Sequence, residues 1–182
     1  MITKITFDTP LGAMIALANK KVVCLLQFTD TPSIEKKILK VAGCKKEDIR
    51  ELETAPLSFL KLEIQKYFQG KVFKFQTPIH LIGTDFQKLT WKTLLNINFG
   101  EKNSYGKIAK SIGRDSAFRA VANANAANAL AIIVPCHRIT NSNGSLGGYN
   151  GGTDRKKWLL DHEKRICLET SRVQNTESCC IN

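Results

Sequence analysis

Residues 132–139 read IIVPCHRI, an apolar run that leads directly into a cysteine, a histidine and an arginine. The ring of Pro135 restricts the backbone immediately before Cys136. A thiol ionises at neutral pH only with a base or a positive charge nearby, and His137 and Arg138 are neighbours of the right kind. This stretch therefore predicts a reactive cysteine carried by an apolar strand.

A glycine-rich segment, NGSLGGYNGG, follows at residues 143–152. It is not a phosphate-binding P-loop, because no Gly-Lys-Ser/Thr sequence completes it. We expect instead a flexible loop that closes over a flat ligand. Residues 154–165 then return to a helical pattern, on which Glu163 can point back toward His137.

Three helices are predicted before the cysteine run, and the last two form a helix–turn–helix pattern around a turn containing Gly113. Apolar spacing, capping residues and glycine stops define them. Their expected limits are residues 85–99, ended by Gly100, residues 105–112, capped by Ser104, and residues 117–127, capped by Ser116.

This helical region carries mainly one sign of charge. Residues 102–153 include six Lys and Arg residues and one acid, Asp115. The third helix is rich in alanine, and Arg119 is its one long cationic side chain, whereas base reading in the major groove needs several such side chains. We infer DNA binding through shape and phosphate contacts. Taken alone, an alanine-rich helix more often reflects helix propensity and tight packing.

The composition of the whole chain agrees with a nucleic-acid partner. Its 182 residues carry a formal net charge of +11, which attracts a polyanion.

The apolar runs of the chain are too short to cross a bilayer, and residues 1–8 lack the apolar core of a signal peptide. Six cysteines occur without a CxxC pair. Free thiols and a cytoplasmic protein, or a nuclear one in a eukaryote, are therefore expected. Nothing indicates an obligate dimer, so we expect a monomer.

The first part of the chain has an α/β pattern, and we place its boundary near Gly83. Apolar runs predict a strand meander over residues 2–7, 14–18 and 22–28, helices over residues 33–41 and 56–68, and a short strand over residues 72–75. The expected organisation is an α/β domain over residues 1–83, a mainly α-helical domain over residues 84–167 and a disordered polar tail over residues 168–182.

The PCHR sequence of residues 135–138 belongs to a longer series of motifs. Arg119-Ala120-Val121 and Asn128 precede it, and GGYNGG at residues 147–152 and KWLL at residues 157–160 follow it. In order and spacing these elements resemble the O6-alkylguanine-DNA alkyltransferases, the methylated-DNA–protein-cysteine methyltransferases, over residues 84–163. The N-terminal part resembles the smaller domain of this family in outline. The resemblance implies a small sheet with helices, of ribonuclease-H-like topology, and a helical domain with a winged-helix-like helix–turn–helix.

The resemblance also implies a reaction. The thiolate of Cys136 takes the alkyl group, such as methyl, from O6 of a guanine flipped out of duplex DNA, irreversibly and once per molecule. His137 acts as the base through a water and Glu163 orients it. Tyr105 donates a hydrogen bond to the purine, and Asn128 ties the turn before the cysteine. O4-alkylthymine is left open as a second substrate.

Further residues follow from the same resemblance. Arg119 fills the space left by the flipped nucleotide, on a helix that lies in the minor groove. The other expected DNA contacts are Tyr105, Ala120, Asn125 and Arg138. The expected lining of the base pocket is Val134, Pro135, Gly147, Tyr149 and Asn150. One departure is Ala129, where the family commonly has proline, so a looser turn is expected. No cofactor is expected, and no metal, because Cys24 and His80 lack further ligands.

Three other functions fit parts of the sequence. A non-catalytic lesion recogniser of the alkyltransferase-like kind replaces the acceptor cysteine, which is present here as Cys136. A cysteine hydrolase needs a direct pair of Cys136 and His137, and adjacent residues of a strand point to opposite faces. A helix–turn–helix regulator leaves the PCHR run and the glycine loop unexplained.

Overall fold

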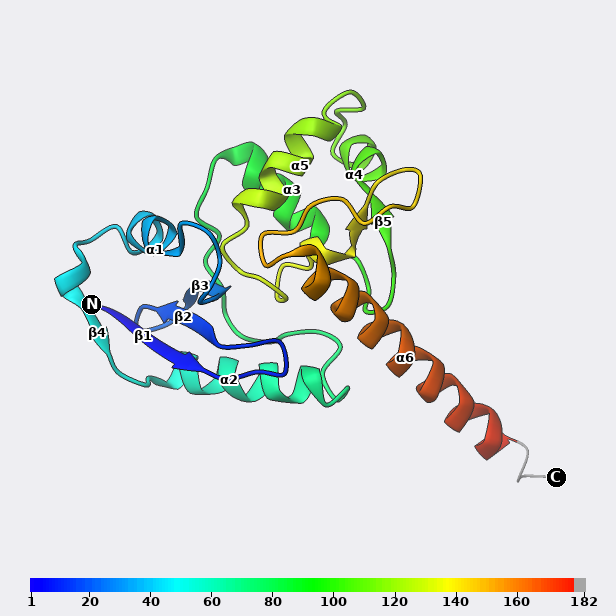
Figure 1. Cartoon of the computed structure of the whole chain (residues 1–182), viewed down its shortest axis with the longest axis horizontal. Coiled ribbons are helices and arrows are strands. Elements are labelled where there is room, and N and C mark those ends of the chain that lie inside the picture. The colour runs from blue at the N-terminus through cyan, green and yellow to red at the C-terminus, as the bar shows by residue number, and fades with distance from the viewer. Residues whose placement is uncertain (179–182) are drawn as a thin grey trace.

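The computed structural model of this protein describes the backbone of residues 1–178 and the side chains of residues 1–172. Cys179 and Cys180 of the predicted tail lie outside the described residues. The chain forms a sheet with two helices, followed by a group of helices that lies beside the sheet (Figure 1). None of the described helices is long and apolar enough to cross a membrane.

The sheet contains the predicted meander. Strands β1 (Ile2–Phe7), β2 (Met14–Ala18) and β3 (Val23–Phe28) are antiparallel neighbours. A short strand that the sequence did not indicate, β4 (Ile49–Glu51), pairs with β1 in parallel, so the strand order is β3-β2-β1-β4. Strand β3 is therefore an edge strand of the four-stranded sheet.

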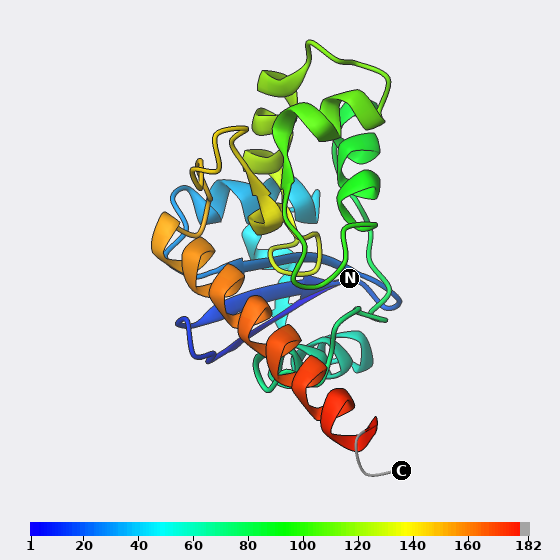
Figure 2. The same ribbon diagram turned by 90° about the vertical axis from the view of Figure 1, so that its right-hand side faces the viewer.

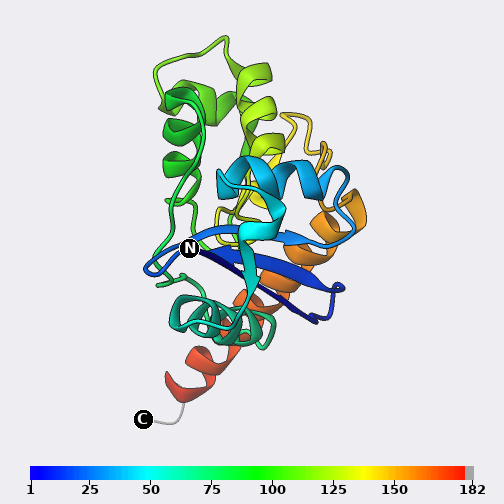
Figure 3. The same ribbon diagram turned by 90° about the vertical axis from the view of Figure 1, so that its left-hand side faces the viewer.

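Both faces of the sheet are covered. Helix α1 (Ile34–Ala42) lies over one face and α2 (Ala55–Phe68) over the other (Figures 1 and 3). A 3-10 turn, η1 (Lys46–Asp48), leads from α1 to β4. The buried residues of β2 alternate between two hydrophobic clusters, with Met14, Ala16 and Ala18 in one cluster and Ile15 and Leu17 in the other. This alternation is the period of a strand buried on both faces.

The helical part contains α3 (Asp85–Leu94), α4 (Tyr105–Ser111), α5 (Phe118–Ala127) and α6 (Thr153–Ser178). The predicted N-cap of α4 is confirmed, because the Ser104 hydroxyl accepts a hydrogen bond from the Lys107 amide at 3.2 Å. Figure 2 shows α3, α4 and α5 gathered at one end of the molecule, with the last turns of α6 projecting beyond the sheet at the other.

The two parts share one hydrophobic core that includes Phe28 and Ile64 from the sheet side and Trp91 and Leu159 from the helical side. Backbone pairing also joins them, because Leu26 of β3 forms a β-bridge with Leu130. The segment that leads to Cys136 is therefore attached to the edge of the N-terminal sheet.

The predicted strand over residues 72–75 is not formed. Residues 78–80 pair with the edge strand β3 instead. The Val23 amide donates to Pro78 O at 2.9 Å, and the His80 amide donates to Val23 O at 2.8 Å. Phe73 lies against Phe99, with ring centroids 4.9 Å apart. The alternating aromatic pattern thus reflects ring packing in a loop.

Other predicted limits also differ. Helix α3 ends at Leu94 rather than near residue 99, because residues 95–101 form successive turns. The N-cap of α5 is Ala117, which has no side-chain cap, so Ser116 does not cap this helix. Helix α6 continues to Ser178, through the first part of the segment predicted to be disordered. An i,i+4 ion pair between Arg165 and Glu169 supports this continuation.

Candidate functional site

Cys136 lies on a tight turn, which corrects the prediction of a strand. Residues Cys136–Arg138 form a 3-10 turn, η2, followed by β6 (Ile139–Thr140), which pairs in parallel with β5 (Asn103–Ser104) ahead of α4. Just upstream, Ile132 has a φ of 70°, a strained conformation for a β-branched residue. The turn holds Cys136 at 6% exposure.

Asn128, at the end of α5, contacts the thiol directly. Its Nδ2 atom donates to Cys136 Sγ at 3.2 Å and to Val134 O at 3.0 Å, and its Oδ1 atom accepts from the Leu130 amide at 2.9 Å. The residue thus ties the turn before the cysteine, as expected, and also places an N–H on the sulfur. A donor at this position favours the thiolate over the thiol.

His137 and Glu163 form a fully buried pair. His137 Nε2 lies 2.8 Å from Glu163 Oε1, so the histidine selected from the cysteine run and the glutamate selected from α6 meet as predicted. Burial lowers the pKa of His137, which favours its neutral form. Its Nδ1 atom is buried and has no hydrogen-bond partner.

Glu163 is the centre of a larger hydrogen-bond network. Arg138 donates to both of its oxygens at 2.9 and 3.0 Å, Tyr67 Oη donates to Oε1 at 2.8 Å, and the Gly100 amide donates to Oε2 at 3.0 Å. Burial by itself raises the pKa of Glu163, but His137 and Arg138 outweigh it and hold the pKa well below its usual range. Glu163 is therefore a carboxylate that fixes the orientation of its neighbours.

Two tyrosines lie close to the thiol. Tyr105 is the first residue of α4 and is half-buried, and burial together with Cys136 raises its pKa. Tyr149 comes from the glycine-rich loop, and burial raises its pKa well above the usual value. Its hydroxyl is buried without a partner. A Cβ atom on Gly147 would lie 3.1 Å from Tyr105 Oη, so the loop passes directly over this tyrosine.

Lys156 is a buried cation that sequence reasoning missed. From α6 its Nζ atom donates to Ile139 O and, at 3.2 Å, to Gly148 O. Burial lowers the pKa of Lys156 to about 8, while Cys136 opposes this shift. Lys156 shares a helical face with Leu159, Leu160 and Glu163, which are all buried. A lysine on an apolar face is the signal that identifies it.

Burial dominates the acidity of Cys136 itself. Removal from water raises its pKa, and the Asn128 hydrogen bond, Lys156 and Lys37 lower it, in that order. Taken together, the arrangement contains a nucleophile, a donor on that nucleophile, a neutral imidazole with a free nitrogen and a carboxylate that orients it. These are the parts that activate a thiol for nucleophilic attack.

Comparison with known proteins assigns both parts of the chain. Residues 2–81 match the ribonuclease-like domain of 6-O-methylguanine DNA methyltransferase, and residues 85–165 match its DNA-binding domain. The chain belongs to the methylated-DNA–protein-cysteine methyltransferase family. The family resemblance of the sequence is thereby confirmed, and so is an architecture of an N-terminal sheet domain and a C-terminal helical domain.

Individual members of this methyltransferase family match over most of their length. A methylated-DNA–protein-cysteine methyltransferase of Mycobacterium leprae is 37% identical over 90% of this chain and 93% of its own. One of Methanosarcina barkeri is 37% identical over 86% of this chain and 94% of its own. The crystal structure of Mycobacterium tuberculosis OGT in complex with DNA has a TM-score of 0.79 and 35% identity, and covers 90% of this chain and 94% of its own.

The residues expected to contact DNA lie in two environments. Arg119 and Ala120 are exposed near the start of α5. Arg138 is buried, and its guanidinium also donates to Ile97 O at 2.6 Å, so its prediction as a DNA contact is wrong. Asn125 is only 7% exposed, with both amide atoms buried and unpartnered, so it is not part of the exposed surface of α5. The Arg138 guanidinium forms a buried ion pair with Glu163 instead of contacting DNA.

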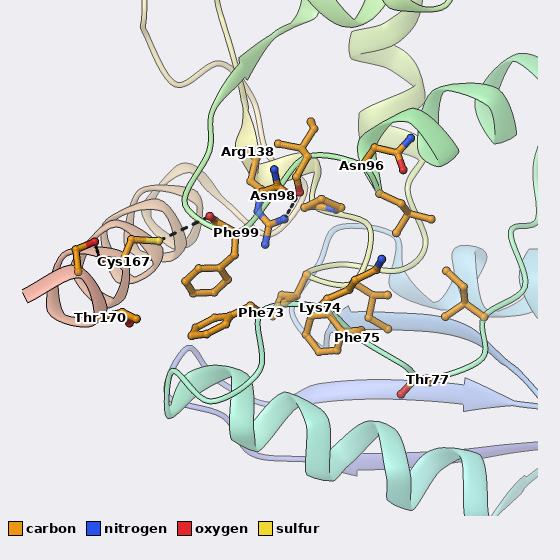
Figure 4. A pocket seen from close by; sticks show the side chains of 17 residues that line it. Phe73, Lys74, Phe75, Thr77, Asn96, Asn98, Phe99, Arg138, Cys167 and Thr170 are labelled. Atoms are coloured by element: carbon orange, nitrogen blue, oxygen red, sulfur yellow. Dashed lines mark hydrogen bonds between the residues drawn. The ribbon is translucent and has the colours of Figure 1, made fainter. Parts of the chain in front are cut away.

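The residues expected to line the base pocket lie in three different places. Val134 O accepts from Asn128 Nδ2 and from the Cys136 amide, Gly147 lies against Tyr105, and the Tyr149 hydroxyl interacts electrostatically with Cys136. The side-chain Nδ2 atom of Asn150 donates to Ala126 O at 2.9 Å and so holds the loop against α5. Pro135 borders a cavity of about 790 Å³ together with Phe73, Phe99 and Arg138, and Cys136 is not in its lining (Figure 4).

No group of three or more His, Cys, Asp and Glu side chains that could hold a metal occurs in the described part of the chain. Cys24 is buried, and its Sγ atom donates to Leu17 O at 3.4 Å. His80 is exposed on the connection between the two parts.

Proposed function

We propose that this protein repairs O6-alkylguanine in duplex DNA by moving the alkyl group to Sγ of Cys136. The observation that carries the proposal is the set of contacts around one thiol: Asn128 donates to its sulfur, and His137, the next residue of the same turn, forms a buried pair with Glu163. A cysteine hydrolase requires a direct contact between imidazole and thiol, whereas the imidazole of His137 binds Glu163 through Nε2 and has no hydrogen-bond partner at Nδ1.

The chemistry follows from these groups. His137 Nδ1 takes the proton of Cys136 through a water, and the resulting thiolate attacks the alkyl carbon. The S–C bond forms as the C–O6 bond breaks, and the electron pair of that bond stays on the guanine. Tyr105 donates a hydrogen bond to the purine as this negative charge develops. The guanine anion takes up the proton that His137 removed from the thiol, so the products are guanine and a thioether; the thioether has no good leaving group, and each molecule acts once.

The target base has to leave the duplex to reach this thiol. Cys136 is 6% exposed, and Tyr149 of the glycine-rich loop interacts with it. We infer that the base is flipped into the site as this loop opens, and that Tyr149, Gly147 and Val134 then contact it. Arg119, exposed on α5, fills the vacated place in the base stack.

Helices α4 and α5 form the DNA-binding unit in this proposal. The small, exposed residue Ala120 lets the backbone of α5 approach the minor groove, where width and charge matter more than base identity. The net charge of +11 strengthens this contact at low salt. The unit corresponds to a winged-helix-like helix–turn–helix that follows a ribonuclease-H-like domain, with residues 1–83 and 84–167 as the two domains.

The remaining parts of the proposal concern partners and place. We infer a monomer that binds duplex DNA carrying O6-alkylguanine; O4-alkylthymine is the second substrate class to test. A thiol that must stay reduced fits the cytoplasm, or the nucleus of a eukaryote.

Mass spectrometry of the intact protein tests the central step. The protein is incubated with a duplex containing one O6-methylguanine, and its peptides are then mapped. We expect one added methyl group on Cys136, no more than one equivalent of repaired DNA, and no transfer by Cys136→Ala. An unmodified protein that still prefers the lesion duplex would identify a non-catalytic recogniser.

A further inference from the structure

The N-terminal sheet holds the segment that carries the thiol's hydrogen-bond donor. The Leu26 amide of β3 donates to Ala129 O at 2.8 Å, and the Ala131 amide donates to Leu26 O at 2.8 Å. Residues 129–131 therefore extend the edge of the sheet beside β3. Asn128 is the residue immediately before this paired segment, so its position depends on β3.

Two side chains of the N-terminal part converge on the Asn128 backbone carbonyl. Gln27 Nε2 donates to this oxygen at 3.0 Å, and Lys37 Nζ of α1 donates to the same oxygen at 3.2 Å. Gln27 is 2% exposed and Asn128 is 3% exposed, so the carbonyl is buried, while Lys37 reaches it from a half-buried position. On its other side, Asn128 donates from Nδ2 to Cys136 Sγ. A single residue thus connects Lys37 to the acceptor sulfur.

The positive charge of Lys37 also interacts with the Cys136 thiol. Burial lowers the pKa of Lys37, and Cys136 is the charged partner that opposes this shift. The same interaction lowers the pKa of Cys136. The groups that interact with Cys136 are Lys37 from α1, Asn128 after α5, Tyr105 from α4, Tyr149 from the loop and Lys156 from α6. His137 is the next residue in the chain, and Glu163 binds His137.

We propose that Lys37 is a positioning residue for alkyl transfer: with Gln27 it holds the Asn128 carbonyl so that the Asn128 amide stays on the sulfur, and its ammonium group favours the thiolate. The N-terminal domain then acts in the reaction, beyond its part in the shared core. This inference rests on the proposed function, since it concerns the rate of that transfer.

The test compares three variants of the full chain. Lys37→Met keeps most of the aliphatic stem and removes the charge, Lys37→Arg keeps the charge, and Lys36→Met is the matched control on an exposed position of the same helix. Methyl transfer from an O6-methylguanine duplex is measured over a range of DNA concentrations. The pH midpoint of Cys136 labelling by iodoacetamide is read from the mapped peptide, and melting curves establish that each variant is folded.

We expect Lys37→Met to lower the saturating transfer rate by about tenfold, the size expected from loss of one nearby positive charge. The half-saturating DNA concentration should stay within about twofold of wild type, because Lys37 lies outside the proposed DNA-binding surface. The labelling midpoint should move to higher pH. Lys37→Arg should recover most of the rate, and Lys36→Met should behave as wild type.

The possible failures are distinguishable. A wild-type protein that transfers no methyl group contradicts the proposed function itself. A wild type that transfers normally, beside a folded Lys37→Met variant with the rate and labelling midpoint of Lys36→Met, overturns the role of Lys37 alone. A folded Lys37→Arg variant as slow as Lys37→Met also overturns it, because retained charge should restore the thiolate.

Discussion

His137 Nε2 lies 2.8 Å from Glu163 Oε1, although 26 residues separate them and both side chains have no exposed surface. A carboxylate accepts a hydrogen bond, so this contact places the imidazole proton on Nε2 and leaves the lone pair on Nδ1. Burial lowers the pKa of His137, so the ring is neutral near pH 7 and Nδ1 is free to take a proton. The pair therefore prepares a base beside Cys136.

Glu163→Gln should reduce the acid sensitivity of the fold. The pKa of Glu163 is held well below its usual range, so its contribution to stability is complete above about pH 4.5 and is lost as pH falls toward the folded-state pKa. Urea unfolding between pH 3 and 7 is the measurement. Wild type should lose stability over this range more steeply than the variant. Glu169→Gln, an exposed carboxylate on the same helix, is the control, and an equal slope for all three proteins contradicts the prediction.

The alkylated protein should be less stable than the fresh protein. A methyl group on Cys136 enters a packed site of 6% exposure and displaces the Asn128 donor from the sulfur. Overpacking of this kind costs about 1–3 kcal/mol. Melting curves before and after reaction with the lesion duplex, with the DNA removed, should show a lower Tm for the reacted sample. Cys136→Ala carried through the same treatment should show no shift, and identical curves for fresh and reacted wild type disprove the prediction.

Arg119→Ala should impair repair of duplex DNA without affecting the fold. The side chain is exposed, so its removal should change the free energy of unfolding by less than about 0.5 kcal/mol. Transfer from the duplex should fall by at least about tenfold, because unstacking a base costs a few kcal/mol that Arg119 no longer offsets. Transfer from the free base O6-methylguanine is the internal control and should keep its wild-type rate. A parallel loss with both substrates would argue against a role in base flipping.

Arg138→Met should destabilise the fold and leave DNA binding unchanged, the reverse of Arg119→Ala. Its guanidinium is buried against Glu163, and breaking one side of a buried ion pair costs about 3–5 kcal/mol. Chemical denaturation should detect this loss, while the affinity of the folded protein for duplex DNA at low temperature should stay near wild type. Arg165→Met removes an exposed arginine on α6 and should cost little stability. A large loss of DNA affinity in folded Arg138→Met would restore the original prediction of a DNA contact.

Gly147→Ala should slow alkyl transfer through Tyr105. Gly147 has a φ of 65°, and an added Cβ would lie 3.1 Å from Tyr105 Oη. Gly144→Ala is a matched control, because Gly144 has a similar φ of 83° and nothing within 4 Å of the added Cβ. Single-turnover rates should therefore fall more for Gly147→Ala than for Gly144→Ala, although both variants carry the same backbone strain. Equal rates would mean that the loop does not position Tyr105.

Much of the local structure was predictable because its signals are local. The meander of β1 to β3 follows from apolar runs separated by turn residues, and the start of α4 follows from the Ser104 cap. The predicted strand at residues 72–75 fails because Phe73 and Phe75 pack as rings rather than across a sheet. Alternating aromatic residues occur both in strands and in loops whose rings pack together, so sequence alone does not distinguish these two structures.

The sequence by itself determined the chemistry: a cysteine after a proline, a histidine beside it and a glutamate on a later helix are the reactive groups in any fold that brings them together. Only the tertiary structure decided which charges face the thiol. Lys37 lies 91 residues before Asn128, and Tyr67 lies 96 residues before Glu163, so neither contact leaves a periodic pattern in the chain. The family resemblance placed Arg138 among the expected DNA contacts. Burial against Glu163 made it a structural ion pair, since a buried charge is stable only when a partner compensates it.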